Sequence, residues 1–315
     1  MTKTIPKIAL GPILYYWDRE TVFDFYQKIA DTPVDIVYLG ETVCSKRRIM
    51  QEKDWLAIAE QLKASGKEVV LSTLTLLEAS SELNKLRRIC ESMDNDKAYM
   101  IEANDMAAVN MLAGRQPFVT GPAINIYNSR TLNVLAQQGL KRWVLPVELS
   151  RQTLADIMAQ IPDSIETEIF AYGRLPLAYS ARCFTARSHN LPKDDCQFHC
   201  LDDPDGLMLS TREDDPFLVL NGIQTQSAKT CSLIGDLDDI IKLGVDVLRI
   251  SPQSKHMENI IRIFHECLHG KASAEEAEQA LIPLMPIGAC NGYWHGGVGM
   301  EERQQHLGEQ SPVHG

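Results

Sequence analysis

Short apolar runs alternate along the chain with segments whose apolar positions recur at helical spacing. In residues 18–30, for example, Val22, Tyr26 and Ile29 fall on one helical face. The apolar runs predict strands at Lys7–Tyr15, Val34–Leu39, Glu68–Thr73, Ala98–Glu102, Phe118–Thr120, Trp143–Leu145, Ile165–Ala171 and Val245–Ile250. The periodic segments predict helices at Asp18–Ala30, Glu52–Ser65, Leu77–Ser92, Met106–Gly114, Ser129–Gly139 and Ser150–Gln160.

Repeated strand–helix alternation with short linkers favours one parallel sheet covered by helices. About eight strands favour a closed, TIM-like (β/α) barrel over an open sheet. No G-x-G-x-x-G segment follows the first predicted strand, so the usual dinucleotide-binding signature is missing, and there is no P-loop. The fold class expected from the pattern is therefore an α/β barrel.

The alternation breaks after about the seventh predicted strand. Residues 173–215 are dense in Pro, Asp and Cys and have little periodicity. A segment of this length is usually functional or disordered, and it leaves the barrel on the rim where loops carry chemistry. We expect one barrel domain over residues 1–287, including this cysteine-rich insertion, and a loosely ordered, Gly- and His-rich C-terminal tail over 288–315.

Composition narrows the class of protein. The 315 residues are 44% hydrophobic and 23% charged, as in an ordinary globular protein, which excludes disorder or coiled coil for the whole chain. The formal net charge of −11 disfavours a nucleic-acid-binding surface. The first residues lack a long apolar signal region, and Pro and Gly interrupt the uncharged segment 280–300. We expect a cytoplasmic protein without a transmembrane segment.

Four of the eight cysteines form a candidate metal site. Cys183, Cys196 and Cys200 lie in the insertion with the spacing C-x12-C-x3-C, and Cys44 follows the second predicted strand. Loops after parallel strands open on one rim of a barrel, so the early cysteine can converge with the later three. Four thiolates at one rim suit zinc or an iron–sulfur cluster, and the spacing alone does not choose between them.

The other candidate residues have plainer interpretations. Cys90, Cys267 and Cys290 are expected to fill the core, and His199 is a solvated neighbour of the thiols or a ligand. Arg182 and Arg187 either favour the Cys183 thiolate or are surface charges. Polar residues expected at the same rim, each able to bind a small anion or to pair with a neighbour, are Glu102, Asn125, Glu148, Arg174 and Arg249.

Two segments resemble the collagenase-like peptidase family. EIFAYGRLPLAYSARC, which ends at Cys183, resembles the family's signature strand and loop, with Ala181 in place of a glycine. NGIQTQSAKTCSLIGDLDDIIKLGVDVLRI resembles a later block of the family. Together with the strand order, the resemblance covers most of the chain. The spacing of Cys44 and the later three cysteines is most similar to the branch of the family that acts in ubiquinone biosynthesis.

That resemblance implies a [4Fe-4S] cluster held by Cys44, Cys183, Cys196 and Cys200. It also implies a heterodimer with a UbiU-like paralogue and oxygen-independent hydroxylation of a quinone precursor, with prephenate as a candidate oxygen source. It assigns no catalytic residue. A cluster bound by four cysteines has no free iron site, so its expected role is electron transfer.

Two features leave alternatives open. Many family members have a cysteine where this chain has Pro176, and another common ligand position matches Cys231, which rivals Cys44 as the fourth ligand. The branch pattern favours Cys44. Separately, residues 265–269 read H-E-C-L-H, which matches the H-E-x-x-H motif of zinc peptidases. A zinc-dependent hydrolase or peptidase is therefore the alternative function, although no third ligand for His265 and His269 is evident.

Overall fold

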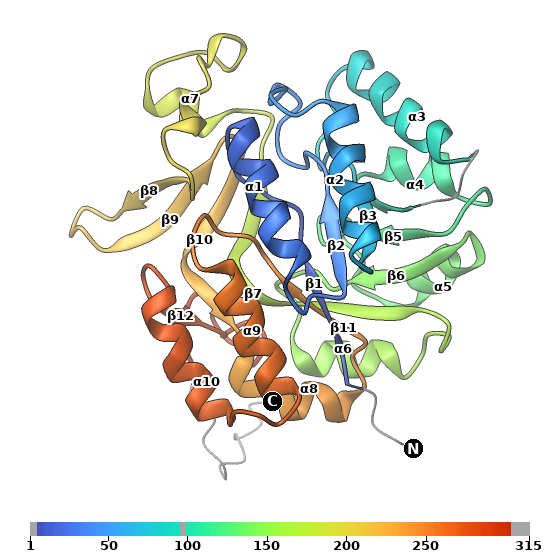
Figure 1. Cartoon of the computed structure of the whole chain (residues 1–315), viewed down its shortest axis with the longest axis vertical. Helices are drawn as coiled ribbons and strands as arrows, with labels where there is room; N and C mark the ends of the chain where they lie inside the picture. Colours follow the sequence, from blue (N-terminus) through green and yellow to red (C-terminus); the bar gives the residue numbers. More distant parts are fainter. Residues whose placement is uncertain (1–4, 95–98, 304–315) are drawn as a thin grey trace, which may run out of the picture.

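The structure is a computed structural model that describes residues 5–94 and 99–303. Within these ranges eight parallel strands close into a barrel, because the last strand pairs with both the first and the seventh (Figure 1). In pairing order the strands are β1 (Lys7–Leu10), β2 (Ile36–Leu39), β3 (Glu68–Ser72), β4 (Met100–Ala103), β5 (Phe118–Thr120), β6 (Leu140–Val144), β7 (Glu166–Tyr179) and β11 (Val247–Ile250). The predicted TIM-like barrel is confirmed.

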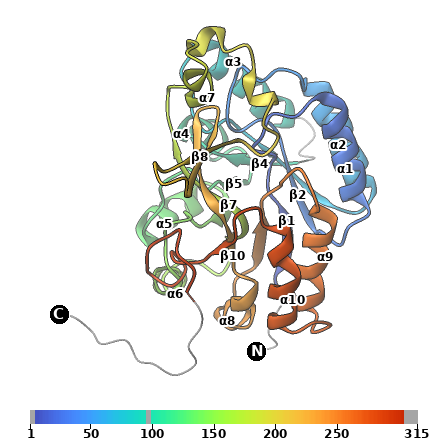
Figure 2. The same cartoon turned by 90° about the vertical axis from the view of Figure 1, so that its left-hand side faces the viewer.

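Helices connect the strands and cover the outside of the barrel, as Figures 1 and 2 show. Several begin where a polar side chain caps a free backbone N–H: Asp18 accepts from Thr21, and Asn128 accepts from Thr131. The helices are α1 (Arg19–Ala30), α2 (Glu52–Ala64), α3 (Ser80–Asp94), α4 (Met106–Leu112), α5 (Ser129–Gln137), α6 (Arg151–Met158), α8 (Leu237–Leu243), α9 (Met257–Leu268) and α10 (Ala274–Leu281).

The first predicted strand, Lys7–Tyr15, is too long. Strand pairing ends at Leu10, and the following residues are buried as a loop across the barrel mouth. Because these loop residues are buried, they are as apolar as a buried strand, and the sequence pattern does not distinguish the two. The predicted sixth strand starts three residues late, and the start of the predicted fourth strand, Ala98, lies outside the described residues.

The insertion contains more regular structure than its sequence indicates. Strand β7 continues to Tyr179, and its second half leaves the barrel to pair antiparallel with β10 (Gln224–Ser232). The sheet then extends through β9 (Pro216–Asn221) to β8 (Leu207–Ser210). Between β7 and β8 lie α7 (Phe184–Ser188) and the 3-10 turns η1 (Lys193–Asp195) and η2 (His199–Leu201). The expectation of little periodic structure from residue 173 onward was wrong for these strands.

The first part of the predicted C-terminal tail packs on the barrel. After the 3-10 turn η4 (Ile282–Leu284) comes β12 (Ala289–Cys290), which pairs with β10 so that Cys290 lies opposite Cys231. The Trp294 side chain is buried, and the backbone carbonyl of Trp294 accepts a hydrogen bond from the backbone N–H of Arg151. Residues 288–303 therefore belong to the packed fold, and residues 304–315 lie outside the described part of the chain.

Charged groups run through the barrel interior. An apolar layer is made by Ala9, Ile36, Tyr38, Val70, Val119, Val144 and Val247. Against it the fully buried Glu168 accepts from Tyr38 Oη at 2.5 Å and from Arg249 Nε at 2.5 Å. On the side of the strand starts, Arg142 binds Glu166 at 2.6 Å. Each buried charge thus has a partner, which is the condition for tolerating it in a core.

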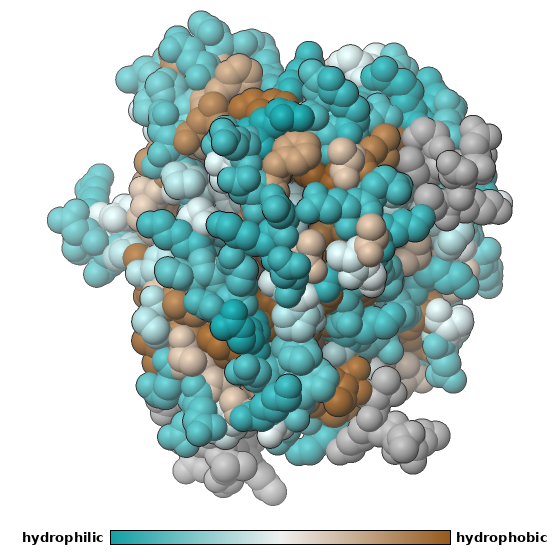
Figure 3. Space-filling model, viewed as in Figure 1, coloured by the Kyte–Doolittle hydropathy of each residue, from teal (hydrophilic) through white to brown (hydrophobic). Residues whose placement is uncertain are grey.

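Among the described residues no helix is long and apolar enough to cross a membrane. The face in Figure 3 is largely hydrophilic, with apolar side chains in small patches.

Replacing Glu168 by Leu should destabilise the protein by about 3–5 kcal/mol, because it leaves Arg249 and Tyr38 buried with one partner fewer. The control is Asp239→Ala, which removes the half-exposed pair with Arg151 and should cost less than about 1 kcal/mol. Urea unfolding measures both. Equal costs would contradict the structural role of the interior charges.

Candidate functional site

A buried arginine joins the segments that carry the cysteines. Arg47, on the β2–α2 loop, has a side chain only 2% exposed. Its Nη1 donates to the Leu14 carbonyl at 2.7 Å, and its Nη2 donates to Asn221 Oδ1 at 2.6 Å. The Glu41 carboxylate lies 3.7 Å from Nη1 and balances the charge. The loop after β1, the loop after β2 and the β9–β10 turn therefore meet at one guanidinium.

The same loop positions Cys44. The Glu41 carboxylate accepts the backbone N–H groups of Val43 and Cys44, both at 2.9 Å, which fixes the turn. The half-buried Cys44 packs in an apolar cluster with Val43, Ile223 and Cys183. Burial raises the pKa of the Cys44 thiol, and the Arg47 cation opposes that rise. The early cysteine and the first of the later three thus share one cluster.

The insertion folds back onto this loop. Cys183 caps α7, its sulfur accepting the N–H of Ala186 at 3.4 Å. Lys46 Nζ donates to Asp194 Oδ1 at 2.5 Å, which ties the β2–α2 loop to η1 beside Cys196. The Lys46 ammonium lies near both Cys44 and Cys196, and their thiolates raise its pKa after the stronger effect of Asp194.

The last cysteine lies against the same arginine. Burial raises the pKa of the Cys200 thiol to about 11, while a hydrogen bond and the charge of Arg47 oppose it. Gln197 and Phe198 have left-handed φ angles of 50° and 57°, so the chain from Cys196 to Cys200 is a tight loop rather than a helical turn. The Phe198 ring packs on the Tyr16 ring, with 5.8 Å between the centroids. The Arg47 guanidinium lies over the same Tyr16 ring, 5.5 Å from its centroid.

The structure therefore brings Cys44, Cys183, Cys196 and Cys200 to one rim of the barrel, all four half-buried. In the described part of the chain, no three His, Cys, Asp or Glu side chains lie close enough to hold a single metal ion.

Cys231 lies elsewhere, buried on β10 opposite Cys290. It follows Ile223, the neighbour of Cys183, by eight residues of largely extended chain, which corresponds to on the order of 20 Å. Cys90 is buried on α3 and Cys290 is buried on β12, which confirms their predicted place in the core, and Cys267 is half-buried on α9.

The remaining candidates are placed as follows. His199 Nδ1 lies 2.9 Å from Asp202 Oδ2, and its ring stacks on His189. His265 and His269 are ring neighbours on α9, 4.1 Å between centroids, and His269 Nδ1 lies 2.7 Å from the His265 carbonyl. Within the described residues no third ligand completes that pair.

A cavity of about 390 Å³ lies at the barrel mouth, within the range of small-molecule sites. Of the polar rim residues expected from the sequence, Glu102, Asn125, Glu148 and Arg249 line it. Arg174 does not line it and donates instead to the Asp205 carbonyl. Further lining residues are Gly11, Pro12, Leu14, Thr42, Thr75, Asn104, Pro122, Ala123, Val147, Phe170, Pro176, Leu177, Ala178, Tyr179 and Ser251.

Tyr179 connects the cavity with the cysteines. It lines the cavity and also packs against the cluster that contains Cys44 and Cys183. Its hydroxyl accepts from Gln224 Nε2 at 2.7 Å, and burial raises its pKa to about 12. The phenol therefore stays neutral at physiological pH, and it separates the thiols from the cavity by about one side chain.

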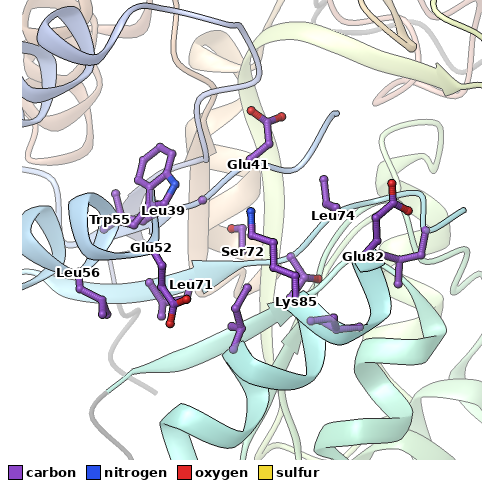
Figure 4. A pocket seen from close by; sticks show the side chains of 15 residues that line it. Leu39, Glu41, Glu52, Trp55, Leu56, Leu71, Ser72, Leu74, Glu82 and Lys85 are labelled. Carbon is purple, nitrogen blue, oxygen red and sulfur yellow. The ribbon is translucent and has the colours of Figure 1, made fainter. Parts of the chain in front are cut away.

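A smaller apolar slot of about 70 Å³ lies outside the barrel, between α2 and α3 (Figure 4). Leucines and Trp55 line it, together with the charged side chains of Lys85 and Glu41. Because Glu41 also holds the Cys44 turn, this slot adjoins the cysteine loop.

Sequence reasoning missed Arg47 and Tyr179. Arg47 comes three residues after Cys44 in the sequence, yet its partners Leu14 and Asn221 are 33 and 174 residues away. The one signal in the sequence is that Arg47 lies close to the candidate ligand Cys44. Tyr179 lies four residues before Cys183, in a segment taken as irregular.

The fold and site define a (β/α)-barrel protein with a cysteine-bearing rim beside its central cavity. Residues 17–303 match the sequence profile of peptidase family U32, and the chain belongs to that family. This confirms, at the level of the family, the resemblance seen in the two segments.

Relatives with assigned names match over shorter stretches. The tRNA hydroxylation protein P of Haemophilus influenzae is 48% identical over 59 residues, 19% of this chain and 13% of that protein. Its namesake from Helicobacter pylori is 28% identical over 171 residues, 50% of this chain and 39% of that protein. The matches thus span well under half the length of these relatives. The solved U32 peptidase Mk0906 aligns with a TM-score of 0.46 and 11% identity, over 81% of this chain and 96% of that one.

Iodoacetamide at pH 8 should modify the metal-free protein at Cys183 and Cys196 well before Cys231 and Cys290. The first two thiols are half-exposed, whereas the other two are buried, and burial raises the pKa of Cys290 to about 12. Peptide mass spectrometry over a time course measures the order of labelling. Early labelling of Cys231 would contradict its buried position on β10.

Proposed function

We propose that this chain is an iron–sulfur protein similar to the ubiquinone biosynthesis protein UbiV. In this proposal Cys44, Cys183, Cys196 and Cys200 hold a [4Fe-4S] cluster. The chain acts with a UbiU-like paralogue in the oxygen-independent hydroxylation of a quinone precursor. The observation that carries the proposal is the convergence of Cys44, from the second strand, with three cysteines at least 139 residues later.

The donor set fits such a cluster. All four candidate ligands are thiols, which are the usual ligands of iron–sulfur clusters. They are neighbours, yet the described residues offer no compact site for one ion. A mononuclear zinc would hold all four ligand atoms about 2.3 Å from one point, whereas cluster thiolates bind separate irons, so metal analysis separates the two.

The positive groups around the thiols support the same assignment. Arg47 bonds to Cys200, and Lys46 lies beside Cys44 and Cys196. A cluster with four thiolate ligands is anionic, and cations and hydrogen bonds near its sulfurs stabilise it and tune its potential. When bound, the cluster supplies electron transfer to the neighbouring cavity. In that arrangement the neutral Tyr179 and the apolar Leu14 form the wall that the cavity shares with the cysteine cluster.

The relatives that match this chain are named tRNA hydroxylation proteins, so their names assign them a hydroxylation of tRNA. For this chain a small substrate is the better choice, because the net charge of −11 disfavours binding to a polyphosphate. The barrel-mouth cavity has the volume for a ring-sized molecule. Prephenate, as oxygen source, would be a further small-molecule partner.

Iron and acid-labile sulfide analysis of anaerobically purified variants tests the ligand set. Wild type and Cys231→Ala should be brown and hold about four irons per chain, whereas Cys44→Ala should lose most of them. Cys90→Ala is a matched control, since it removes a buried thiol of α3 that is not one of the four candidate ligands. Colourless wild-type protein with one zinc per chain would refute the cluster, and iron loss in Cys231→Ala alone would move the fourth ligand.

A gene deletion tests the substrate. Cells grown without oxygen should lose ubiquinone and accumulate a less hydroxylated precursor, with tRNA hydroxylation unchanged. Both products are measured by mass spectrometry of lipid and nucleoside extracts. The tagged protein should also retain a UbiU-like paralogue during anaerobic purification. The reverse pattern, with tRNA hydroxylation lost and ubiquinone normal, would assign the chain to the tRNA-modifying branch.

A further inference from the structure

The hairpin formed by β8 and β9 stands out from the barrel and carries an apolar face (Figure 1). The register places Leu207 opposite Leu220 and Leu209 opposite Leu218, so the four leucines share one face of the hairpin. All four are half-buried or exposed, and none packs against the buried apolar clusters of the described residues. Leu209 is 42% exposed. A contiguous apolar face that the chain leaves uncovered is typical of an interaction surface.

The same hairpin ends the sheet. The pairing order runs from β7 through β10 and β9 to β8, and among the described residues no strand pairs with the outer side of β8. The sequence of β8, Leu-Met-Leu-Ser, contains neither a charge nor a proline, which are the usual means of protecting a free edge. The outward backbone groups of β8 are therefore able to bond to an added strand, which would also bury the neighbouring leucines.

Carboxylates surround this edge. The segment 202–215 contains six carboxylates and one arginine. Glu213, Asp214 and Asp215 lie at the exposed tip of the hairpin, and their carboxylates form no ion pair with the described residues. The tip projects as a hydrophilic knob at the left of Figure 3. A ligand of this hairpin must therefore combine apolar side chains with positive charge.

The charges also select among the kinds of partner. In an antiparallel pair of β8 with the β8 of a second copy, the acidic segments of the two copies would lie side by side, and like charges oppose that arrangement. Nucleic acids and anionic membranes are repelled for the same reason. A different protein with lysine or arginine beside an apolar strand satisfies both the edge and the tip.

We propose that the β8–β9 hairpin docks a different protein chain, whose strand pairs with β8 and covers the four leucines while its cations meet the acidic tip. The inference deepens the proposed function and rests on it for the identity of that chain, the UbiU-like paralogue. Backbone hydrogen bonds and buried leucines supply the affinity, and the charges speed and orient the encounter.

This docking surface is connected to the cysteine-bearing rim. Strand β9 ends at Asn221, whose Oδ1 accepts from Arg47 Nη2 at 2.6 Å. The turn η2, which contains Cys200, leads into the hairpin along the chain. A partner on β8 therefore lies beside the segment that carries three of the four candidate ligands.

Binding of the purified UbiU-like paralogue to the anaerobically purified full-length chain, measured by biolayer interferometry, tests the surface. Leu209→Asp places a charge on the leucine face and should weaken binding at least about tenfold, with an unchanged melting temperature because Leu209 is exposed and packs on no buried cluster. Val134→Asp is the matched control. It changes an apolar residue of α5 that is 55% exposed, and it should bind like the wild type.

The charged tip is tested separately. Glu213→Lys combined with Asp215→Lys should weaken binding at about 50 mM salt by about threefold to tenfold and should remove most of the salt dependence between about 50 and 300 mM. The control is Asp31→Lys combined with Asp163→Lys, which makes the same change in net charge in the loops that lead into β2 and β7. This control should keep the affinity and the salt dependence of the wild type.

Hydrogen exchange of the complex locates the contact. The backbone amides of β8 should exchange more slowly when the paralogue is bound, and those of α5 should be unchanged. Paralogue binding that Leu209→Asp leaves intact, or that does not protect β8, would overturn the inference and leave the proposed function standing. A wild-type chain that does not bind the paralogue would overturn both the inference and the proposed heterodimer. A homodimer that Leu209→Asp dissociates would assign the hairpin to a second copy and overturn the inference. Iron content, measured on the same samples, reports on the cluster independently of docking.

Discussion

The candidate site depends on one buried cation. Arg47 makes contacts to the loop after β1, to the turn between β9 and β10, and to the sulfur of Cys200. A guanidinium has several donors in a fixed plane, so it can hold several chain segments at once, and burying it requires that they all stay in place. The loop that carries Cys44 is thereby fixed against the segments that carry the later cysteines. The Lys46–Asp194 ion pair and the packing of Val43 against Ile223 add to this contact from the same loop.

The barrel explains why distant cysteines can meet there. Parallel strands send the loops that follow them to one end, so the loop after β2 and the extension of β7 share a rim. The antiparallel continuation of β7 with β10 and β9 then brings the Gly222 turn back to that rim, where its carbonyl accepts the N–H of Phe184 at 2.8 Å. The cysteines and the cavity consequently share a wall, formed by Leu14 and Tyr179. Under the proposed function, a cluster at the cysteines and a substrate in the cavity would therefore lie on the two sides of one wall.

Local patterns predicted much of this architecture. Apolar runs and capping residues such as Asp18 predicted the order of strands and helices, and that order predicted the barrel. The position of Cys44 directly after a strand predicted that it lies on the rim. The failures have a common cause. Strand β10 and the end of β7 are recognisable only by their pairing with each other, since residues such as Thr225 and Gln226 have no strong strand pattern. Arg47 and Tyr179 likewise gain their roles from partners far away in sequence, which local reasoning does not see.

We propose that one iron–sulfur centre lies among Cys44, Cys183, Cys196 and Cys200. An anaerobic crystal structure with anomalous diffraction data collected at the iron edge tests it most directly. We expect the iron signal to be one compact group of four irons at the rim beside Arg47, with each of the four sulfurs bonded to a different iron. Iron density between Cys231 and the later cysteines, or a Cys44 sulfur turned away from the metal, would contradict it.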